Sequence, residues 1–385
     1  MSRARALSHD KQPHVLFAIL DWGLGHATRT WPLIVAARRL GARVTIASRG
    51  AAGRWLDARM AEWDERHAGD AWPRWDRVEK PGTTIRYAKG IGTLPRIALQ
   101  MPAFIRSIGE ERRWTTGHAM THGVTHIFSD NCYGARAELD GVSNVFMSHQ
   151  LQPPVPLVAK DLARRMVMRY VAAFDEVWVP DTPDHALAGA LAHPISDFTR
   201  YVGPLSRFQV LDASERVDKD EVVLLGLVSG PEPQRSAMED DLRACFAKDG
   251  RSALILSGKP GGREERQGNV LTVPDADDHR FRAAVLSAEF IVCRSGYSTL
   301  LDLAVLGRKA ILVPTIGQPE QEKLAREWSA KYGWHVLHAS DLANFTPGTE
   351  GMPGVHVRVT APGPEAEMRE WLQTRNAHAP IPLSP

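Results

Sequence analysis

The chain has 385 residues, of which 43% are hydrophobic and 24% are charged. At roughly 100–200 residues per domain, this length predicts two or three domains, each large enough to bury a core. A formal net charge of +2 excludes the strongly basic balance of nucleic-acid-binding proteins, so no nucleic-acid partner is expected. No apolar run reaches the ~20 residues of a membrane span. The three scattered cysteines also suit a cytoplasmic protein.

The first part of the chain alternates strand-like and helix-like segments. Residues 14–20 predict a buried strand, a glycine turn follows, and 28–41 predict a helix that ends at a glycine. Further buried strands are expected at 43–48, 125–130, 142–150 and 174–181. This alternation predicts a parallel sheet with functional loops at the carboxyl ends of its strands. The tryptophan-rich segment 54–75 fits no regular element.

A second series of α/β segments follows residues 200–220, which are rich in Gly, Pro and charge and predict an interdomain linker. Strands are expected at 221–230, 252–258, 268–273, 289–296 and 309–315, and helices at 238–250, 278–288, 297–307 and 364–375. We therefore expect one α/β domain at residues 1–205 and another at 206–375, with a loose tail at 376–385.

The most informative motif follows the strand that ends at Cys293. There "RSGYST" opens a helix, whose unpaired first-turn N–H groups and dipole favour an anionic phosphate. The small and hydroxyl residues of this turn are Ser295, Gly296, Ser298 and Thr299. Asp302, about two turns into the helix, suits a ribose diol, and the loop residues Gln318, Glu320 and Gln321 suit sugar hydroxyls. A plain serine-capped helix is the alternative for the turn alone, but the ordered set favours a nucleotide-sugar site.

This stretch resembles the C-terminal donor-binding half of the GT-B glycosyltransferases of family 28. That family includes the peptidoglycan enzyme that adds N-acetylglucosamine to lipid I. The stretch "DWGLGHATR" resembles the family's first glycine-rich loop, and "VFMSHQL" stands in the place of its His-Glu-Gln-Asn loop. The hinge is matched by "YVGPLSRF" and the second glycine-rich loop by "SGPEPQR". The segment "LSGKPGG" resembles the family's Ser-Gly-Lys segment. A poorly characterised bacterial subgroup is more similar still. The resemblance implies an α/β GT-B fold, two Rossmann-like domains facing each other across a cleft.

The resemblance also implies how the donor is bound. The turn after Cys293 would face the diphosphate, Asp302 the ribose in place of the family's usual Glu, and Gln318 and Gln321 the transferred sugar. The full expected donor-side set is Gly25, Ser229, Gly230, Ser257, Arg294, Ser295, Gly296, Ser298, Thr299, Asp302, Gln318, Glu320 and Gln321. Uracil is expected from the family, so the donor would be a UDP-sugar, with UDP-N-acetylglucosamine as one option. No cofactor is expected, and no DxD motif in a suitable context predicts a metal.

The first glycine-rich loop carries a histidine, His26. A dinucleotide fingerprint GxGxxG would use Gly23 and Gly25, but its third position is Thr28 and no acid follows at the required distance, which disfavours NAD. In a GT-B enzyme this histidine can take the proton of the acceptor hydroxyl. We therefore predict His26 as the general base. The alternative is a histidine that only caps or packs the loop.

A base histidine works better with a carboxylate that fixes its tautomer. Asp130 is the predicted partner, as in the plant and antibiotic-modifying GT-B enzymes that the arrangement resembles, and Asp21 is the competing carboxylate. His149 is a rival base. The residues expected on the acceptor side are Asp21, Trp22, Asn131 and Gln150.

The basic segment 155–174 carries Lys160, Arg164, Arg165 and Arg169 among apolar residues at helical spacing. The pattern is typical of an ordinary surface helix or of a helix that contacts an anionic membrane peripherally. Residues 94–114 are a second candidate for such a contact.

The predicted reaction is inverting transfer of a sugar to an acceptor hydroxyl, without a metal. The acceptor is open, a lipid-linked or cell-envelope glycan precursor being one option. The competing hypotheses are a nucleotide-sugar hydrolase or epimerase on the same fold, and a non-catalytic nucleotide-sugar sensor.

Overall fold

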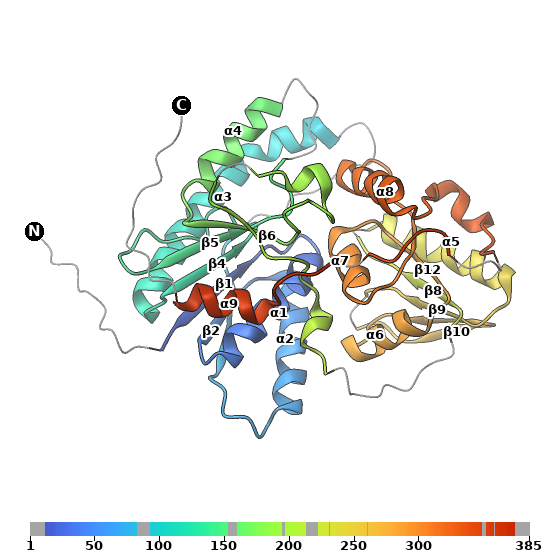
Figure 1. The fold of residues 1–385 in the computed structure, drawn as a ribbon, viewed down its shortest axis with the longest axis horizontal. Helices are drawn as coiled ribbons and strands as arrows, with labels where there is room; N and C mark the ends of the chain where they lie inside the picture. Colours follow the sequence, from blue (N-terminus) through green and yellow to red (C-terminus); the bar gives the residue numbers. More distant parts are fainter. Residues whose placement is uncertain are drawn as a thin grey trace, which may run out of the picture. The chain divides into compact units, whose positions relative to one another are not determined.

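The chain separates into two compact units. In the computed structural model, one unit comprises Met1–Leu205 with Ala361–Pro385, and the other comprises Ser206–Thr360 (Figure 1). The structure describes residues 12–82, 93–152, 160–194, 197–212, 222–230, 232–259, 261–348, 352–357 and 359–373, with the backbone alone at 93–100 and 160–163. The expected tail at 376–385 and the linker residues 213–220 lie outside the described residues.

The first unit is built on a seven-stranded sheet in the order β3-β2-β1-β4-β5-β6-β7, with every pair parallel. Its strands are β1 (His14–Ile19), β2 (Arg43–Ala47), β3 (Trp75–Val78), β4 (His126–Asp130), β5 (Ser143–Met147), β6 (Glu176–Val179) and β7 (Thr199–Tyr201). All residues of β1, β4 and β5 are buried, as the near-continuous apolar runs predict for a parallel sheet covered on both faces. The expected strands are therefore present, within shorter bounds.

The helices of this unit connect consecutive strands or return to the sheet. They are α1 (Gly25–Arg39), α2 (Gly50–Arg66), α3 (Thr93–His122), α4 (Lys160–Val171), the 3-10 helix η3 (Gly189–Ala192) and α9 (Pro364–Gln373). Helix α1 begins three residues earlier than the predicted 28, and so includes His26 in its first turn. It ends as predicted before Gly41, whose φ of 85° is the left-handed conformation that glycine adopts without a steric penalty.

The tryptophan-rich segment that matched no regular element forms most of α2 and the start of β3. Its rings pack around Trp31 of α1, with centroid separations of 6.2 Å to Trp55, 6.2 Å to Trp63 and 5.5 Å to Trp75. The guanidinium of Arg38 lies 3.9 Å from the centre of the Trp75 ring, a cation–π contact. Side chains that bury this much area hold an otherwise irregular sequence in a helix and an edge strand.

Helix α9 belongs to the first unit, although we expected residues 206–375 to form one domain. It packs against α1, and Figure 1 shows the two helices, red and blue, side by side. Trp371 is fully buried and donates from Nε1 to Ser143 Oγ at 2.9 Å. Its ring also meets those of His126 and Phe128 edge-on. The amphipathic pattern of α9 predicted a helix, but it did not say which sheet the helix would cover.

The second unit is a six-stranded sheet in the order β10-β11-β9-β8-β12-β13. Its strands are β8 (Leu224–Leu227), β9 (Ala253–Leu256), β10 (Glu265–Gln267), β11 (Val270–Val273), β12 (Phe290–Cys293) and β13 (Ile311–Leu312). All pairs are parallel except the β10–β11 hairpin, whose first strand was not predicted. Its helices are η4 (Arg207–Val210), α5 (Gln234–Asp249), α6 (Asp278–Ser287), α7 (Tyr297–Val305), α8 (Pro319–Tyr332) and η5 (Ala339–Asn344).

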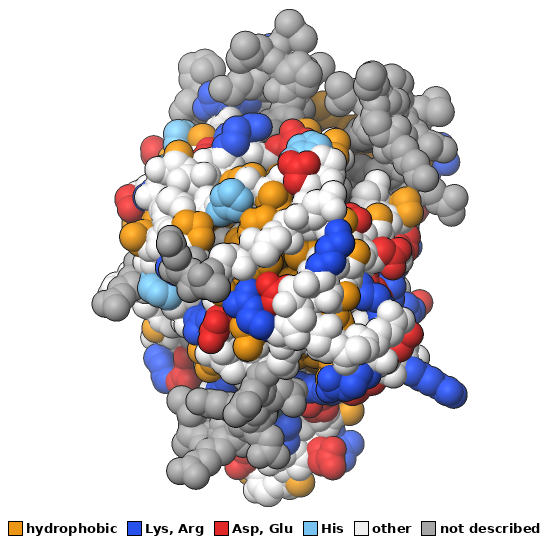
Figure 2. Space-filling model, turned by 90° about the vertical axis from the view of Figure 1, so that its right-hand side faces the viewer, with side chains coloured by type: hydrophobic (Ala, Val, Ile, Leu, Met, Phe, Trp, Pro, Cys, Tyr) orange, Lys and Arg blue, Asp and Glu red, His pale blue; other side chains and the backbone are white. Residues whose placement is uncertain are grey.

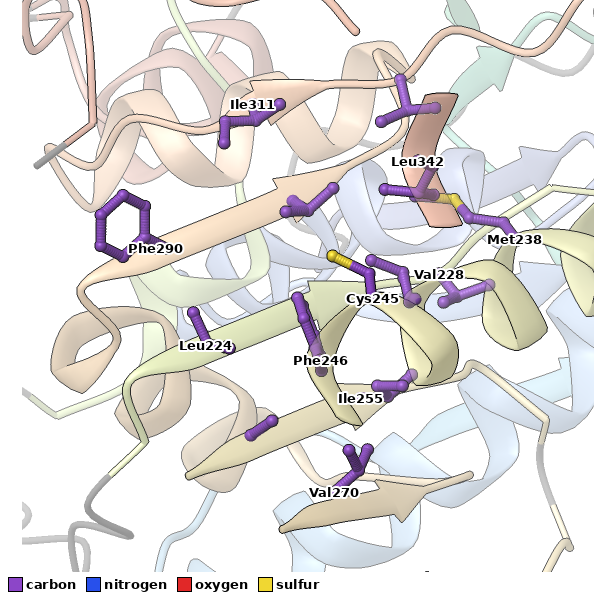
Figure 3. Close-up of a cluster of buried hydrophobic side chains, with 14 residues drawn as sticks. Leu224, Val228, Met238, Cys245, Phe246, Ile255, Val270, Phe290, Ile311 and Leu342 are labelled. Carbon is purple, nitrogen blue, oxygen red and sulfur yellow. The ribbon is translucent and has the colours of Figure 1, made fainter. Parts of the chain in front are cut away.

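The core of the second unit lies between this sheet and α5 (Figure 3). Cys245 and Phe246 of α5 point onto the sheet, and Leu242 of the same helix belongs to the same buried cluster. A Cβ at Gly226 would lie 2.8 Å from Leu242 Cδ1, so the glycine lets the helix approach the sheet closely. Burial at about 25 cal/mol per Å² of apolar area makes such a cluster the main source of stability for the unit.

The surface carries both signs of charge. On the face that Figure 2 shows, Lys and Arg side chains are interspersed with Asp and Glu, in keeping with the small net charge of +2. On α4 the predicted basic face is present as exposed Arg164, Arg165 and Arg169, while the side chain of Lys160 lies outside the described set. Among the described residues, no helix combines the length and apolarity needed to cross a membrane.

Acidification is expected to destabilise the first unit through His126. Burial lowers the pKa of this imidazole from 6.5 to about 4, against the opposing effect of a backbone hydrogen bond at Trp371. Unfolding therefore takes up a proton between these two pKa values, and the free energy of unfolding falls as the pH is lowered through that window. Urea unfolding at about pH 7 and about pH 5 measures the loss.

The variant His126→Phe should show a smaller loss because its ring cannot titrate, and the same change at exposed His356 serves as the control. The effect should be reduced rather than abolished, because burial also lowers the pKa of His118 to about 4. An unchanged loss in His126→Phe would contradict the assignment.

Candidate active site

The site in the first unit lies where the order of its strands reverses. β1 and β4 are adjacent although they are far apart in sequence, and their register sets Ile19 beside Asp130 at the carboxyl ends. Ligands of open α/β sheets bind at such switch points. The chain continues from β1 through the glycine turn into α1, so the first turn of α1 stands directly over the end of β4.

His26 and Asp130, the predicted base and its partner, are in contact. His26 Nδ1 lies 2.9 Å from Asp130 Oδ1, and the exposed fractions of the two side chains are 16% and 0%. The imidazole thus reaches solvent while the carboxylate is sealed beneath it, which is the geometry a base needs to meet a substrate hydroxyl. Asp21, the competing carboxylate, binds Arg49 instead, with Nε 2.8 Å from Oδ2.

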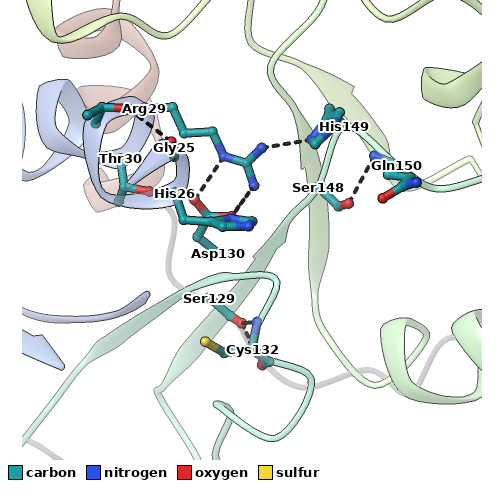
Figure 4. Close-up of polar contacts among 11 residues, drawn as sticks. Gly25, His26, Arg29, Thr30, Ser129, Asp130, Cys132, Ser148, His149 and Gln150 are labelled. Carbon is teal, nitrogen blue, oxygen red and sulfur yellow. Dashed lines mark hydrogen bonds and ion pairs between the residues drawn. The ribbon is translucent and has the colours of Figure 1, made fainter. Parts of the chain in front are cut away.

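The sequence analysis missed Arg29, which joins the site together (Figure 4). Its Nε donates to Asp130 Oδ2 at 2.9 Å, and its Nη2 donates to Asp130 Oδ1. Its Nη1 lies 2.7 Å from Nδ1 of His149, on the segment after β5. Thr30 Oγ1 donates to Asp130 Oδ2 at 2.8 Å. Residues three and four positions after His26 share its helix face, and this spacing would have revealed both contacts had the helix been started at Gly25.

The charge of Asp130 is fixed by these neighbours. Burial by itself would raise the pKa of the carboxyl, but the Arg29 guanidinium and His26 hold that pKa well below its usual range. Asp130 is therefore an anion at every physiological pH. It can orient and stabilise a neighbouring imidazole, and it cannot itself accept the proton of a substrate.

The expected acceptor-side residues Asp21, Trp22 and Asn131 line one pocket of the first unit, with an empty volume of about 330 Å³. Its other walls are Leu20, Lys80, Gly82, Phe104, Ser107, Ile108, Glu111, Cys132 and Tyr133. The ammonium of Lys80 lies 2.7 Å from Glu111 Oε1, so this pair adds little net charge. Gln150 lies elsewhere, half-buried beside Ser148, whose Oγ accepts its backbone N–H at 3.0 Å.

Several of the expected donor residues of the second unit lie at the carboxyl ends of β8 and β12, again where the order of strands reverses. Ser229 and Gly230 follow β8, and Arg294 to Gly296 follow β12. Gly296 occupies the N-cap of α7 and supplies no side-chain cap. The binding of a phosphate by the first-turn amides of this helix stays a prediction. Ser298 and Thr299 are partly exposed on this turn, as are Gln318 and Glu320 at the start of α8.

Three of the expected donor side chains are used by the fold itself. Arg294 donates from Nη1 to the carbonyl of Val313 at 3.1 Å and from Nη2 to that of Gln234 at 3.0 Å. Ser295 Oγ donates to the carbonyl of Gln321 at 2.8 Å. Gln321 in turn accepts from the backbone N–H of Thr315 at 2.9 Å. These side chains shape the turn before α7 and the loop before α8, and Arg294 Nε is buried without a hydrogen-bond partner among the described residues.

Asp302 is also engaged within the second unit. Its Oδ1 accepts from Ser206 Oγ at 2.6 Å, and its Oδ2 lies 3.5 Å from Nε of Arg207. Burial raises the pKa of Asp302 to about 6, although Arg207 and Ser206 oppose the shift. Ser257 differs from these, since its hydroxyl is buried without a hydrogen-bond partner among the described residues.

A profile of the "Glycosyltransferase family 28 C-terminal domain" matches residues 276–345. The matched residues all lie in the second unit. The chain is 28% identical over 200 residues to the UDP-N-acetylglucosamine--N-acetylmuramyl-(pentapeptide) pyrophosphoryl-undecaprenol N-acetylglucosamine transferase of Nocardioides sp. (strain ATCC BAA-499 / JS614), covering 50% of this chain and 52% of the relative. It is 39% identical over 71 residues to the enzyme of the same name from Methylobacterium sp. (strain 4-46), covering 18% and 17%. The chain thus spans about half the length of the first relative and less of the second.

Solved structures extend the likeness to nearly the whole chain. Spinosyn rhamnosyltransferase SpnG superposes with a TM-score of 0.59 at 13% identity, over 87% of this chain and 90% of that one. The calicheamicin glycosyltransferase CalG4 superposes with a TM-score of 0.55 at 14% identity, over 94% and 90%. The chain has the GT-B fold. In the described residues, no group of three His, Cys, Asp or Glu side chains is arranged to hold a metal ion.

Removing the anion from the site should destabilise the first unit. Asp130→Asn leaves the Arg29 guanidinium, only 2% exposed, without a counter-charge, which costs about 3–5 kcal/mol for buried pairs. The thermal unfolding midpoint should fall accordingly, while His26→Gln, at a partly exposed position, should change it little. Replacing both charged residues in Arg29→Met/Asp130→Leu should recover part of the loss. An Asp130→Asn protein as stable as the parent would contradict the prediction.

Proposed function

We propose that the protein is a glycosyltransferase that moves a sugar from a nucleotide-sugar donor to the hydroxyl of an acceptor. The observation that carries the proposal is the contact of His26, in the first turn of α1, with the buried Asp130 at 2.9 Å. The match to the family 28 C-terminal domain at residues 276–345 supports a sugar donor. The GT-B fold supports binding of the acceptor by the first unit and of the donor by the second.

In the proposed reaction His26 Nε2 takes the proton of the acceptor hydroxyl. The freed oxygen forms a bond to the anomeric carbon of the donor, and the bond from that carbon to the diphosphate oxygen breaks. Attack opposite the leaving group inverts the anomeric centre. Asp130 stabilises the imidazolium that forms, and the first-turn amides of α7 stabilise the negative charge on the departing diphosphate. No step requires a metal ion.

We propose a UDP-sugar as the donor, and UDP-N-acetylglucosamine is the first to test because the two curated relatives carry it in their names. A lipid-linked acceptor is supported by the same names, which specify a pyrophosphoryl-undecaprenol substrate. The exposed arginines of α4, Arg164, Arg165 and Arg169, could then hold the protein peripherally at the inner, anionic membrane surface. The aromatic pocket beside Asn131 is the alternative location for an acceptor.

Nucleotide binding tests the donor half. Titration calorimetry with UDP, GDP, TDP, CMP and NAD should show selective binding of UDP. Asp302→Asn should weaken it about 10–100-fold, because hydrogen bonds to charged groups contribute about 1.5–3 kcal/mol. Ser206→Ala is the matched control, since it removes the same internal hydrogen bond and leaves the carboxylate. Equal weakening in both variants would mean that Asp302 acts only through the fold, and no nucleotide binding at all would refute the donor assignment.

Turnover tests the base. His26→Gln should leave the affinity for UDP unchanged and lower kcat about 10²–10⁴-fold, the usual contribution of general acid–base catalysis. Mass spectrometry should find the sugar on the acceptor, and addition of EDTA should have no effect. Free sugar released without an acceptor would indicate a hydrolase, and binding without turnover would indicate a sensor. Full activity in His26→Gln would rule out this base.

A further inference from the structure

One guanidinium group contacts both histidines of the site. Arg29 uses Nε and Nη2 on Asp130 and Nη1 on Nδ1 of His149, and its Nη2 also lies 2.9 Å from Nδ1 of His26. Only 2% of the Arg29 surface is exposed to solvent. Figure 4 shows it between the two imidazoles, with Asp130 beneath. The network therefore specifies where the protons of both imidazoles are.

The proton position is most tightly constrained at His149. An arginine side chain carries five N–H donors, accepts no hydrogen bond and stays charged at every relevant pH. At 2.7 Å from Arg29 Nη1, Nδ1 of His149 must accept and so carries no proton. A neutral imidazole has one N–H, which places it on Nε2. His149 is then a hydrogen-bond donor at Nε2 and has no lone pair there with which to act as a base.

The opposite arrangement holds at His26. Its Nδ1 lies 2.9 Å from both Asp130 Oδ1 and Arg29 Nη2. Nη2 already donates to the same carboxylate oxygen. Asp130 is an anion that can only accept, so a lone pair on Nδ1 would face the negative Oδ1, whereas an N–H on Nδ1 gives that oxygen a further donor. The N–H of His26 therefore points to Asp130, which leaves the lone pair on Nε2, the atom that a base uses.

We infer that Arg29 is a positioning residue that gives the two histidines opposite tautomers, making His26 the base and His149 a neutral donor. The tautomers follow from contacts within the first unit, whereas their catalytic meaning rests on the proposed function. Arg29 also shares the charge of Asp130 with His26. Among the described residues, the charged groups in contact with His26 are Asp130 on β4 and Arg29 on α1, and His149 after β5 contacts the same guanidinium. A neutral residue at 29 would leave the Asp130 carboxylate with the Thr30 hydroxyl and with His26 as its one remaining ionisable partner.

The direct test is two-bond ¹H–¹⁵N NMR on the full-length protein with ¹⁵N-labelled histidine, assigned with His26→Gln and His149→Gln. Between about pH 6 and about pH 8, where histidines normally titrate, His149 should stay neutral with its proton on Nε2. Neutral His26 should carry its proton on Nδ1. A His149 that titrates in this range, or that is protonated on Nδ1, would overturn the inference. The spectra need no substrate, so they decide it even if the proposed function fails.

Kinetics tests the catalytic part once turnover is measured. His149→Gln should keep the acid limb of the pH–rate profile whatever its effect on kcat, unlike His26→Gln. Arg29→Gln should lower kcat about 10–100-fold without changing KM for the nucleotide sugar, and should move the acid limb to higher pH. Arg29→Lys should restore the limb, because it restores the charge, but not the rate, because it lacks the planar fork.

Loss of the acid limb in His149→Gln would make His149 the base and overturn the assignment. If the acid limb of the pH–rate profile is unchanged in Arg29→Gln, Arg29 only packs in the site and does not position the histidines. Arg29→Met/Asp130→Leu is the folding control for the charge removal. Its thermal midpoint shows whether the site remains folded when neither charge is present.

Discussion

The first unit depends on how one buried anion is neutralised. Asp130 is fully enclosed, and an ionised carboxylate cannot stay there unless a cation and several donors replace its water. One face of α1 supplies this cation and these donors from His26, Arg29 and Thr30, which are spaced i, i+3 and i+4. The same contacts that permit the charge also fix the start of α1 over the end of β4. Stability and chemistry therefore depend on the same few atoms, and a substitution at Asp130 or Arg29 will alter both.

Strand order explains why two distant segments meet at this point. The sheet places β1 between β2 and β4, so the order of the strands reverses at β1, and ligands of open α/β sheets bind at such a reversal. The second unit has the same reversal of strand order, with β8 between β9 and β12. Each unit thereby brings a helix N-terminus to its switch point, the first with a histidine on it and the second with small and hydroxyl residues.

Much of this arrangement could be predicted from the sequence, and the failures have physical causes. Buried parallel strands are continuous apolar runs, so β1, β4 and β12 were predicted at nearly their observed places. The meeting of His26 with Asp130 followed from two strand ends. The pattern did not reveal Arg29 because it predicts a helix that begins at Thr28, which leaves His26 outside the helix and removes the i, i+3 relation between the two residues.

Other differences arise from tertiary contacts. The segment that became α2 has no clear periodicity, since its tryptophans pack against α1 rather than along one stripe. Ser295, Arg294 and Gln321 were expected to face a ligand, but polar groups at a buried loop must first satisfy the backbone around them. No local pattern states which carbonyl a given guanidinium will reach.

The return of α9 to the first unit affects how the protein can be synthesised. Because Trp371 fills a space between the β-sheet and α1, the first unit cannot finish folding until residues 364–373 have left the ribosome. The second unit is continuous in sequence, Ser206–Thr360, and is available to fold earlier. Domains usually mature in order from the N-terminus during translation. Here the second unit can finish folding first, although it is synthesised later. The first unit, which carries His26 and His149, stays incomplete until α9 is available.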